Sequence, residues 1–185
     1  MATAVVKRLI NVEEYYKMAE VGILKPDDRV ELINGEIFEM SPIGSRHAAI
    51  VNKLAGLLNE LFKGKAVIGV QVPVRINYNN EPEPDIALLQ YRPDYYASEH
   101  PVPADALAII EVAGSSISFD REVKTPLYAF HSIPEYWIID LENNQIEVFT
   151  KPKDGTYSET QIYRAGDEVM LMGKNLSVKE MLILK

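Results

Sequence analysis

Two short apolar runs, each with a carboxylate at one end, constrain this chain more than any other feature of its sequence. Asp85 precedes the apolar residues 86–89, and Glu111 follows the apolar residues 107–110. Such runs have the length and composition of buried strands. A carboxylate at the end of a buried strand is costly unless it is paired with a cation or holds a metal. Lys124 follows, and two carboxylates with one ammonium are what metal-assisted phosphodiester cleavage uses.

The composition is that of an ordinary globular protein. The chain has 185 residues, of which 47% are hydrophobic and 25% charged, so we expect one domain, residues 1–185, with a sizeable core. It has no apolar run long enough for a transmembrane helix, and its first residues lack the apolar segment of a signal peptide. It also has no cysteine, which excludes disulfides and thiolate metal sites. These features predict a soluble, cytoplasmic protein without membrane partners.

The net charge of −8 argues against non-specific nucleic-acid binding over the whole surface. A metal ion can offset part of this charge at a site rich in carboxylates. Any surface that faces DNA must therefore be a local basic strip.

The order of elements predicts an α+β (α/β-like) domain with a mixed central sheet flanked by helices. Asn34-Gly35 is a strong signal for a two-residue hairpin turn. Apolar residues recur at helical spacing after Ser45. The expected helices are residues 12–19, 45–62 and 120–131, and the expected strands are residues 29–33, 36–40, 66–70, 72–76, 85–90, 106–112, 135–140, 145–150 and 157–163.

Chain neighbours usually pair in a sheet, and this brings the two carboxylates together. If residues 85–90 and 106–112 pair antiparallel, Asp85 at the start of one lies beside Glu111 at the end of the other. Two oxygen ligands completed by water suit Mg²⁺, or alternatively Mn²⁺. Such an ion polarises a phosphoryl oxygen and activates a bound water.

Lys124 is expected on a helix that returns from the Glu111 strand, where Asp120, Lys124 and Tyr128 share one face. Its ammonium would then stabilise the charge of the reacting phosphate. Pro126 either kinks this helix or occupies the first turn of a helix that starts later than Asp120, and the sequence leaves both open.

An ordered set of motifs resembles the Uma2 family of restriction endonuclease-like proteins, common in cyanobacteria and formerly a domain of unknown function. The motifs, which extend over about residues 11–183, are Glu31-Leu32-Ile33-Asn34-Gly35-Glu36, His47, Glu83-Pro84-Asp85-Ile86, Ile110-Glu111-Val112, Asp120…Lys124…Tyr128 and Pro134-Glu135-Tyr136-Trp137-Ile138-Ile139-Asp140.

The resemblance implies membership of the PD-(D/E)XK nuclease superfamily, with a restriction-endonuclease-like core and Mg²⁺-dependent cleavage of DNA. It makes Asp85 and Glu111 the two motif acids and Glu31 an upstream acid that completes the metal site. The superfamily lysine would stand at Ala113. Uma2-like proteins carry it on the following helix, and Lys124 matches that placement. Catalytic Asp85, Glu111 and Lys124, with Asp85, Glu111 and Glu31 at the metal, form the predicted site.

Each of these residues also has a structural interpretation. Asp85 can cap a turn, Glu111 can pair with a surface lysine, and Lys124 can be a solvated helix residue. Glu31 can be exposed on its strand. The roles of three further residues stay open between packing or capping and function: His47, Asp120 and Tyr128.

Two other functions remain possible from the sequence. The same fold can serve as a catalytically inactive module that binds nucleic acid or protein, which the acidic net charge favours. A carboxylate-pair glycosidase is the other, but the lysine and the absence of an aromatic sugar-cleft pattern argue against it. A homodimer is compatible with cutting two strands, and the apolar residues Ile146, Val148 and Phe149 could supply its interface.

Overall fold

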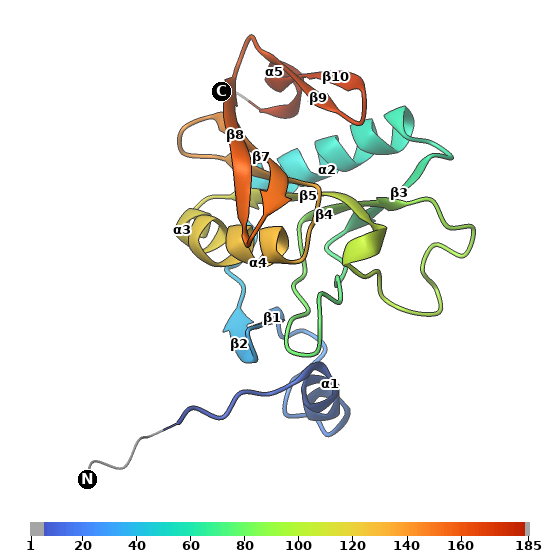
Figure 1. Ribbon diagram of the computed structural model, residues 1–185, viewed down its shortest axis with the longest axis vertical. Coiled ribbons are helices and arrows are strands. Elements are labelled where there is room, and N and C mark those ends of the chain that lie inside the picture. Colours follow the sequence, from blue (N-terminus) through green and yellow to red (C-terminus); the bar gives the residue numbers. More distant parts are fainter. Residues whose placement is uncertain (1–5, 184–185) are drawn as a thin grey trace.

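A six-stranded mixed sheet forms the centre of the protein, seen in a computed structural model that describes residues 6–183 (Figure 1). Its strands are, in spatial order, β3 (Ala66–Val70), β4 (Ile86–Gln90), β5 (Ala106–Ala113), β6 (Glu135–Asp140), β7 (Gln145–Lys153) and β8 (Thr156–Arg164). Within this sheet β5 and β6 run parallel, and the other neighbours run antiparallel. The predicted mixed α+β fold is therefore confirmed.

The other elements are helices and two hairpins. The helices are α1 (Val12–Glu20), α2 (Ser45–Leu61), α3 (Ile117–Phe119), α4 (Thr125–Phe130) and α5 (Val178–Met181). The hairpins are β1 (Val30–Ile33) with β2 (Glu36–Glu39), and β9 (Glu168–Leu171) with β10 (Lys174–Ser177). In Figure 1, α2 and the β9–β10 hairpin lie above the sheet, and α3, α4 and the β1–β2 hairpin lie below it.

Alternation along the central strands divides the apolar core into two layers. Ile110 and Val112 of β5 pack on the side of α2 and α5, whereas Ile109 and Ala113 pack on the side of α4. Glu111 lies between these last two in the alternation, so its side chain belongs to the α4 side. The alternation therefore aims this carboxylate at the helical segment that carries Lys124.

The predicted Asn34-Gly35 hairpin is present, with both residues in the left-handed region, at φ 52° and 74°. A Cβ added to Gly35 would lie 2.7 Å from Cβ of Leu9 and 2.9 Å from the carbonyl oxygen of Ile10. The turn thus needs glycine both for its conformation and for the close approach of the preceding chain.

The strand expected at residues 72–76 is absent, and this prediction is wrong. Strand β3 ends at Val70 because Gln71 takes a left-handed conformation (φ 49°) that turns the chain out of the sheet. The following amides bond to loops: Val74 N–H donates to Pro82 O at 2.9 Å, and Arg75 N–H donates to Pro101 O at 2.8 Å. The alternating apolar residues of this segment, Val74 and Ile76 among them, pack into the core although the segment pairs with no strand of the sheet.

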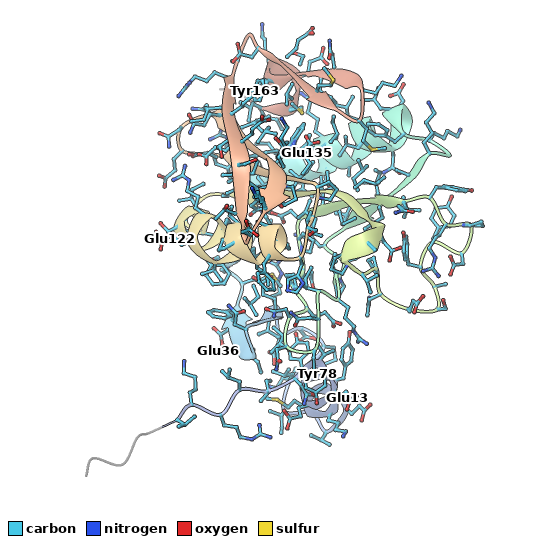
Figure 2. All side chains as sticks on the ribbon, viewed as in Figure 1. Glu13, Glu36, Tyr78, Glu122, Glu135 and Tyr163 are labelled. Carbon is cyan, nitrogen blue, oxygen red and sulfur yellow. The ribbon has the colours of Figure 1, made fainter. Side chains whose placement is uncertain are left out.

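The segment expected as one helix at residues 120–131 is a composite. A π-helical turn, Asp120–Lys124, follows α3 and continues into α4, whose first turn holds Pro126. The backbone is therefore helical from Ile117 onward, and Pro126 lies just after the π-helical turn. In the π-helical turn Lys124 is buried. Glu122 of the same turn is exposed and points outward (Figure 2).

The apolar residues considered for a dimer interface are mostly interior. Ile146 and Val148 of β7 are buried in the layer on the α2 side, and Phe149 packs against Tyr136 and Tyr157. These side chains therefore pack inside the protein and do not form an exposed apolar surface for a second copy. Among residues 6–183, no helix has both the length and the apolar character needed to cross a bilayer.

Candidate active site

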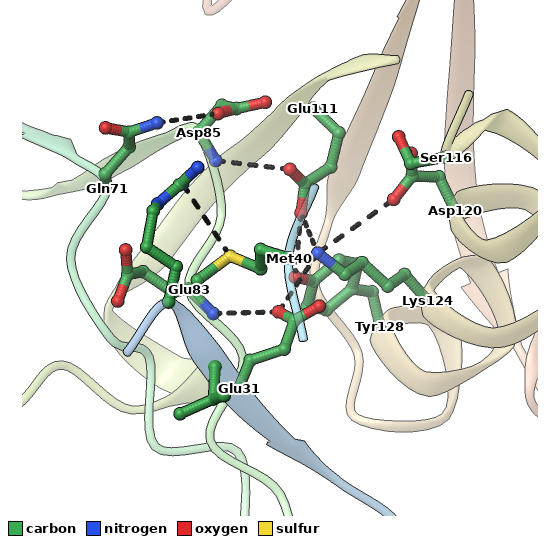
Figure 3. Close-up of polar contacts among 12 residues, drawn as sticks. Glu31, Met40, Gln71, Glu83, Asp85, Glu111, Ser116, Asp120, Lys124 and Tyr128 are labelled. Carbon is green, nitrogen blue, oxygen red and sulfur yellow. Dashed lines mark hydrogen bonds and ion pairs between the residues drawn. The ribbon is translucent and has the colours of Figure 1, made fainter. Parts of the chain in front are cut away.

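Asp85 and Glu111 lie side by side at the junction of β4 and β5 (Figure 3). The antiparallel register pairs Ile86 with Ile110, which places the preceding Asp85 opposite Glu111. The backbone N–H of Asp85 donates to Oε2 of Glu111 at 3.2 Å, and the N–H of Val112 donates to Oδ2 of Asp85 at 2.9 Å. Each carboxylate is thus tied to the other's strand, as the sequence-based pairing argument expected.

Lys124 reaches the same place from the π-helical turn. Its Nζ lies 2.9 Å from Oε1 of Glu111, 3.1 Å from Oε2 of Glu31 and 3.9 Å from Oδ1 of Asp120. All four side chains are 6% exposed or less. One buried ammonium therefore lies among three buried carboxyl groups, which is an ion cluster and not the solvated lysine of the structural interpretation.

Glu31 is brought to the site by β1. The loop before β4 pairs with this strand, because the N–H of Glu81 donates to Leu32 O at 2.8 Å. The N–H of Glu83 in turn donates to Oε2 of Glu31 at 3.2 Å. Glu31 is 4% exposed, so it is not the exposed strand residue that alternation allowed.

Two residues hold the carboxylate of Asp85 in place. Nε2 of His47, in the first turn of α2, lies 2.9 Å from Oδ2, and the Nε2 amide of Gln71 donates to Oδ1 at 3.2 Å. Nδ1 of His47 is buried and finds no hydrogen-bond partner within residues 6–183. The sequence left the role of His47 open and gave no sign of Gln71, whose contribution depends on the left-handed turn that ends β3.

Asp120 and Tyr128 complete the surroundings of Lys124. Oγ of Ser116 donates to Oδ2 of Asp120 at 2.9 Å, and the Tyr128 hydroxyl donates to Oε1 of Glu111 at 3.4 Å. The sequence signals for these residues were their helical spacing and their place in the ordered set of motifs. His131, which follows α4, contacts a different residue: its Nε2 lies 3.0 Å from Nδ2 of Asn77.

The electrostatics follow from crowding several carboxyl groups around one lysine. Burial raises the pKa of Glu111 well above its ordinary value, and burial also raises the pKa of Asp120 and of Glu83. Burial opposes the charge on Lys124, yet Glu111 and Glu31 together raise its pKa well above the usual value. The site therefore holds a firmly charged lysine and more carboxyl groups than that lysine can neutralise.

Asp85 behaves differently from its neighbours. Burial favours its neutral form, but the hydrogen bond and charge of His47 and the amide of Val112 lower its pKa below the ordinary value. Asp85 is thus ionised and oriented, as a metal ligand or electrostatic group needs to be.

The cluster opens into a cavity of about 620 Å³. Its charged floor contains Glu31, Asp85, Glu111, Asp120 and Lys124, and its rim is formed by the chain after β2 and the first turn of α2. The volume is in the range of small-molecule and cofactor sites. A reacting group of about nucleotide size can therefore enter.

The donor set fits Mg²⁺. Within residues 6–183, no three His, Asp or Glu side chains are arranged to ligate one ion. Mg²⁺ does not need three, because it is usually held by one or two carboxylates and keeps several waters. Asp85 and Glu111 would provide this pair if an ion is bound. Glu31 contacts Lys124 and the Glu83 amide, and its role as a ligand stays a prediction.

Ion pairs and a hydrogen bond connect the π-helical turn and α2 to the end of β6 and to β7. Arg121 forms a bidentate ion pair with Glu147 of β7, and its Nη2 also lies 3.2 Å from Oδ2 of Asp140 at the end of β6. From the other side, Arg46 donates to Leu141 O at 2.5 Å. Residues 140–147 therefore contact both the π-helical turn that carries Lys124 and the first turn of α2 that carries His47.

Comparison with known proteins identifies the family. The family model described as Uma2, putative restriction endonuclease, matches residues 12–177. The chain belongs to the Uma2 family. The resemblance drawn from the ordered motifs is confirmed, and the match covers every residue of the Uma2 ion cluster. No curated protein matches the chain.

A solved structure supports the fold of this Uma2 protein. It is the crystal structure of a putative nuclease belonging to DUF820 from Anabaena variabilis ATCC 29413. The TM-score is 0.74 at 16% sequence identity, covering 94% of this chain and 97% of that chain. At this identity the likeness establishes the fold alone.

Proposed function

We propose that this Uma2 protein is a divalent-metal-dependent endonuclease that hydrolyses DNA phosphodiester bonds. The observation that carries the proposal is the junction of β4 and β5, where Asp85 and Glu111 adjoin and Lys124 lies 2.9 Å from Glu111. Two carboxylates and a charged lysine at the floor of one cavity are the groups that phosphodiester hydrolysis needs. The family description supports the same chemistry.

In this proposal Asp85 and Glu111 hold the metal, Mg²⁺ or alternatively Mn²⁺. The ion supplies Lewis-acid activation of the phosphodiester and of the attacking water. His47 and the Val112 amide keep Asp85 ionised and oriented. Residues that orient a ligating carboxylate in this way typically change affinity or activity by about 10–100-fold when removed.

Lys124 acts as a fixed positive charge. Because Glu111 and Glu31 raise its pKa well above the ordinary value, it stays an ammonium at neutral pH and is not a proton acceptor. Its positive charge would stabilise the negative charge that develops on the phosphate oxygens. Glu31, Glu111 and Asp120 restrict the directions in which this ammonium can point.

The proposal is tested with the purified protein and a panel of single- and double-stranded DNA in Mg²⁺ or Mn²⁺. Asp85→Asn keeps the size of the side chain but removes its charge, and we expect cleavage to fall by at least about 100-fold. The matched control is Asp154→Asn in the exposed β7–β8 turn, where asparagine also tolerates the left-handed conformation.

Equal cleavage by Asp85→Asn and the parent protein would remove the assignment of the site. If no DNA is cut and Mn²⁺ titration shows no saturable binding, the catalytically inactive binding module becomes the better description. Circular dichroism of each variant, compared with the parent, establishes that the fold is kept.

A further inference from the structure

The candidate catalytic groups lie at the floor of the cavity and not on an open surface. The side chains of Glu31, Glu111 and Lys124 are 4–6% exposed, and that of Asp85 is 13% exposed. A phosphodiester bond must therefore enter the cavity of about 620 Å³ to meet them. A backbone held in a paired duplex is part of a wide rod, whereas a single strand can bend into a cavity of this size.

One wall of the cavity is apolar, which a phosphate alone does not explain. The rings of Phe38 and Phe119 contact each other with centroids 4.9 Å apart, and both line the cavity. Met40, Pro42 and Ile43 extend this wall along the chain after β2, and Ile43 is 41% exposed. Apolar and aromatic side chains beside a phosphate site are the surface on which an unpaired base packs. In a duplex the bases are stacked inside and cannot reach such a wall.

The charges of the cavity also favour a single strand over a duplex. Its basic lining residues are Arg29, Arg46 and Lys124, and its acidic ones are Glu31, Glu39, Glu83, Asp85, Glu111 and Asp120. Binding of a duplex usually neutralises many phosphates along an extended basic surface. Three cations inside a protein of net charge −8 match contact with only one or two phosphates.

From these observations we propose that the cavity takes an unpaired DNA strand, single-stranded or frayed from a duplex end, with one base against the apolar wall. This inference rests on the proposed nuclease function and narrows its substrate. The charged floor holds the phosphodiester, and the wall of Phe38, Phe119 and Ile43 holds the adjoining base.

The experiment compares one 30-nucleotide DNA sequence as a single strand, as a blunt duplex and as a duplex with an unpaired 3′ or 5′ arm. Cleavage is followed in Mg²⁺ or Mn²⁺, and binding is followed by fluorescence anisotropy in Ca²⁺. We expect kcat/KM at least tenfold higher for the single strand, with cuts in the forked substrate confined to the arm. The same order is expected for affinity.

Variants of the wall separate base contact from phosphate contact. Ile43→Ser removes an exposed apolar side chain of the rim loop, and we expect kcat/KM on the single strand to fall three- to tenfold. The control Ile162→Ser changes a side chain of similar exposure, 49%, on β8 outside the cavity lining, and should leave cleavage unchanged. Phe119→Ala should have a larger effect, with a thermal scan to confirm folding.

The possible results distinguish this inference from the proposed function. Equal or faster cleavage of the blunt duplex overturns the unpaired-strand inference while the nuclease assignment stands. An unchanged Ile43→Ser variant overturns the role of the wall. If no form of DNA is cut, the nuclease proposal fails. The anisotropy measurements alone then test whether the cavity binds an unpaired strand. Tighter binding of the single strand then supports an unpaired-strand site, and equal binding of the duplex overturns it.

Discussion

Nζ of Lys124 lies 2.9 Å from Oε1 of Glu111, although the two residues come from a π-helical turn and from the end of a central strand. Both side chains are almost completely buried, at 6% and 5% exposure. The contact joins a helical segment to the sheet through charge and not through apolar packing. A buried ion pair contributes little net stability, but the loss of one partner is costly because the other remains charged.

Loss of Lys124 should therefore destabilise the metal-free protein. Lys124→Met leaves Glu31, Glu111 and Asp120 without their cation, and we expect the free energy of unfolding to fall by about 3–5 kcal/mol. Urea unfolding followed by circular dichroism measures this change. Lys53→Met on the exposed face of α2 is the control and should change stability by less than about 0.5 kcal/mol. A small effect at Lys124 would mean that the folded protein does not depend on this cation to balance the three acids.

His47 should act on activity through Asp85. Its Nε2 lies 2.9 Å from Oδ2 of Asp85, and this contact helps to lower the pKa of that carboxyl group. We expect His47→Gln to reduce nuclease kcat/KM by about 10–100-fold, with apparent Mg²⁺ affinity reduced in parallel. His100→Gln, an exposed residue that stacks on Tyr16, is the matched control. Unchanged metal affinity in His47→Gln would argue against a positioning role.

Asp140 should make stability depend on pH in the acid range. Burial would raise its pKa, but Asn143, the Glu142 amide and Arg121 lower it below the ordinary value. Since the folded-state pKa is the lower one, the stabilisation is complete above about pH 4 and is lost as the pH falls through the folded-state pKa.

The corresponding variant is Asp140→Asn. We expect it to reduce the free energy of unfolding by about 1–3 kcal/mol near neutral pH, because it weakens the contacts with Arg121 and the turn amides. The difference from the parent protein should shrink below about pH 3. Urea titrations of both proteins near neutral pH and below about pH 3 measure this difference in the free energy of unfolding. A difference that does not vary with pH would contradict the link between the Asp140 pKa and stability.

Removal of divalent metal should abolish DNA binding as well as cleavage. The cavity lining has six carboxyl groups and three Lys or Arg side chains, so without a metal it repels phosphate. We expect anisotropy titrations in EDTA to show at least tenfold weaker binding than in Ca²⁺. Added NaCl at the same ionic strength is the control and should not restore binding. Strong binding in EDTA would place the DNA contacts outside this cavity.

The sequence by itself determined the central strands and the position of their carboxylates. The strands β4, β5 and β6 appear in the sequence as continuous apolar runs, because both faces of these strands are buried. Antiparallel pairing of chain neighbours then placed Asp85 opposite Glu111, since register fixes which strand ends meet. The Asn34-Gly35 turn was equally readable, because few other residue pairs tolerate its conformation.

The tertiary structure alone decided which further side chains join this pair. Gln71 reaches Asp85 because a left-handed residue ends β3, and no periodicity in residues 72–76 signals that turn. Arg121 and Asp140 are 19 positions apart in the chain, yet Nη2 of Arg121 lies 3.2 Å from Oδ2 of Asp140. Local sequence patterns report which face of an element is buried. They do not report which distant element covers it, because that choice is made by the packing of the whole fold.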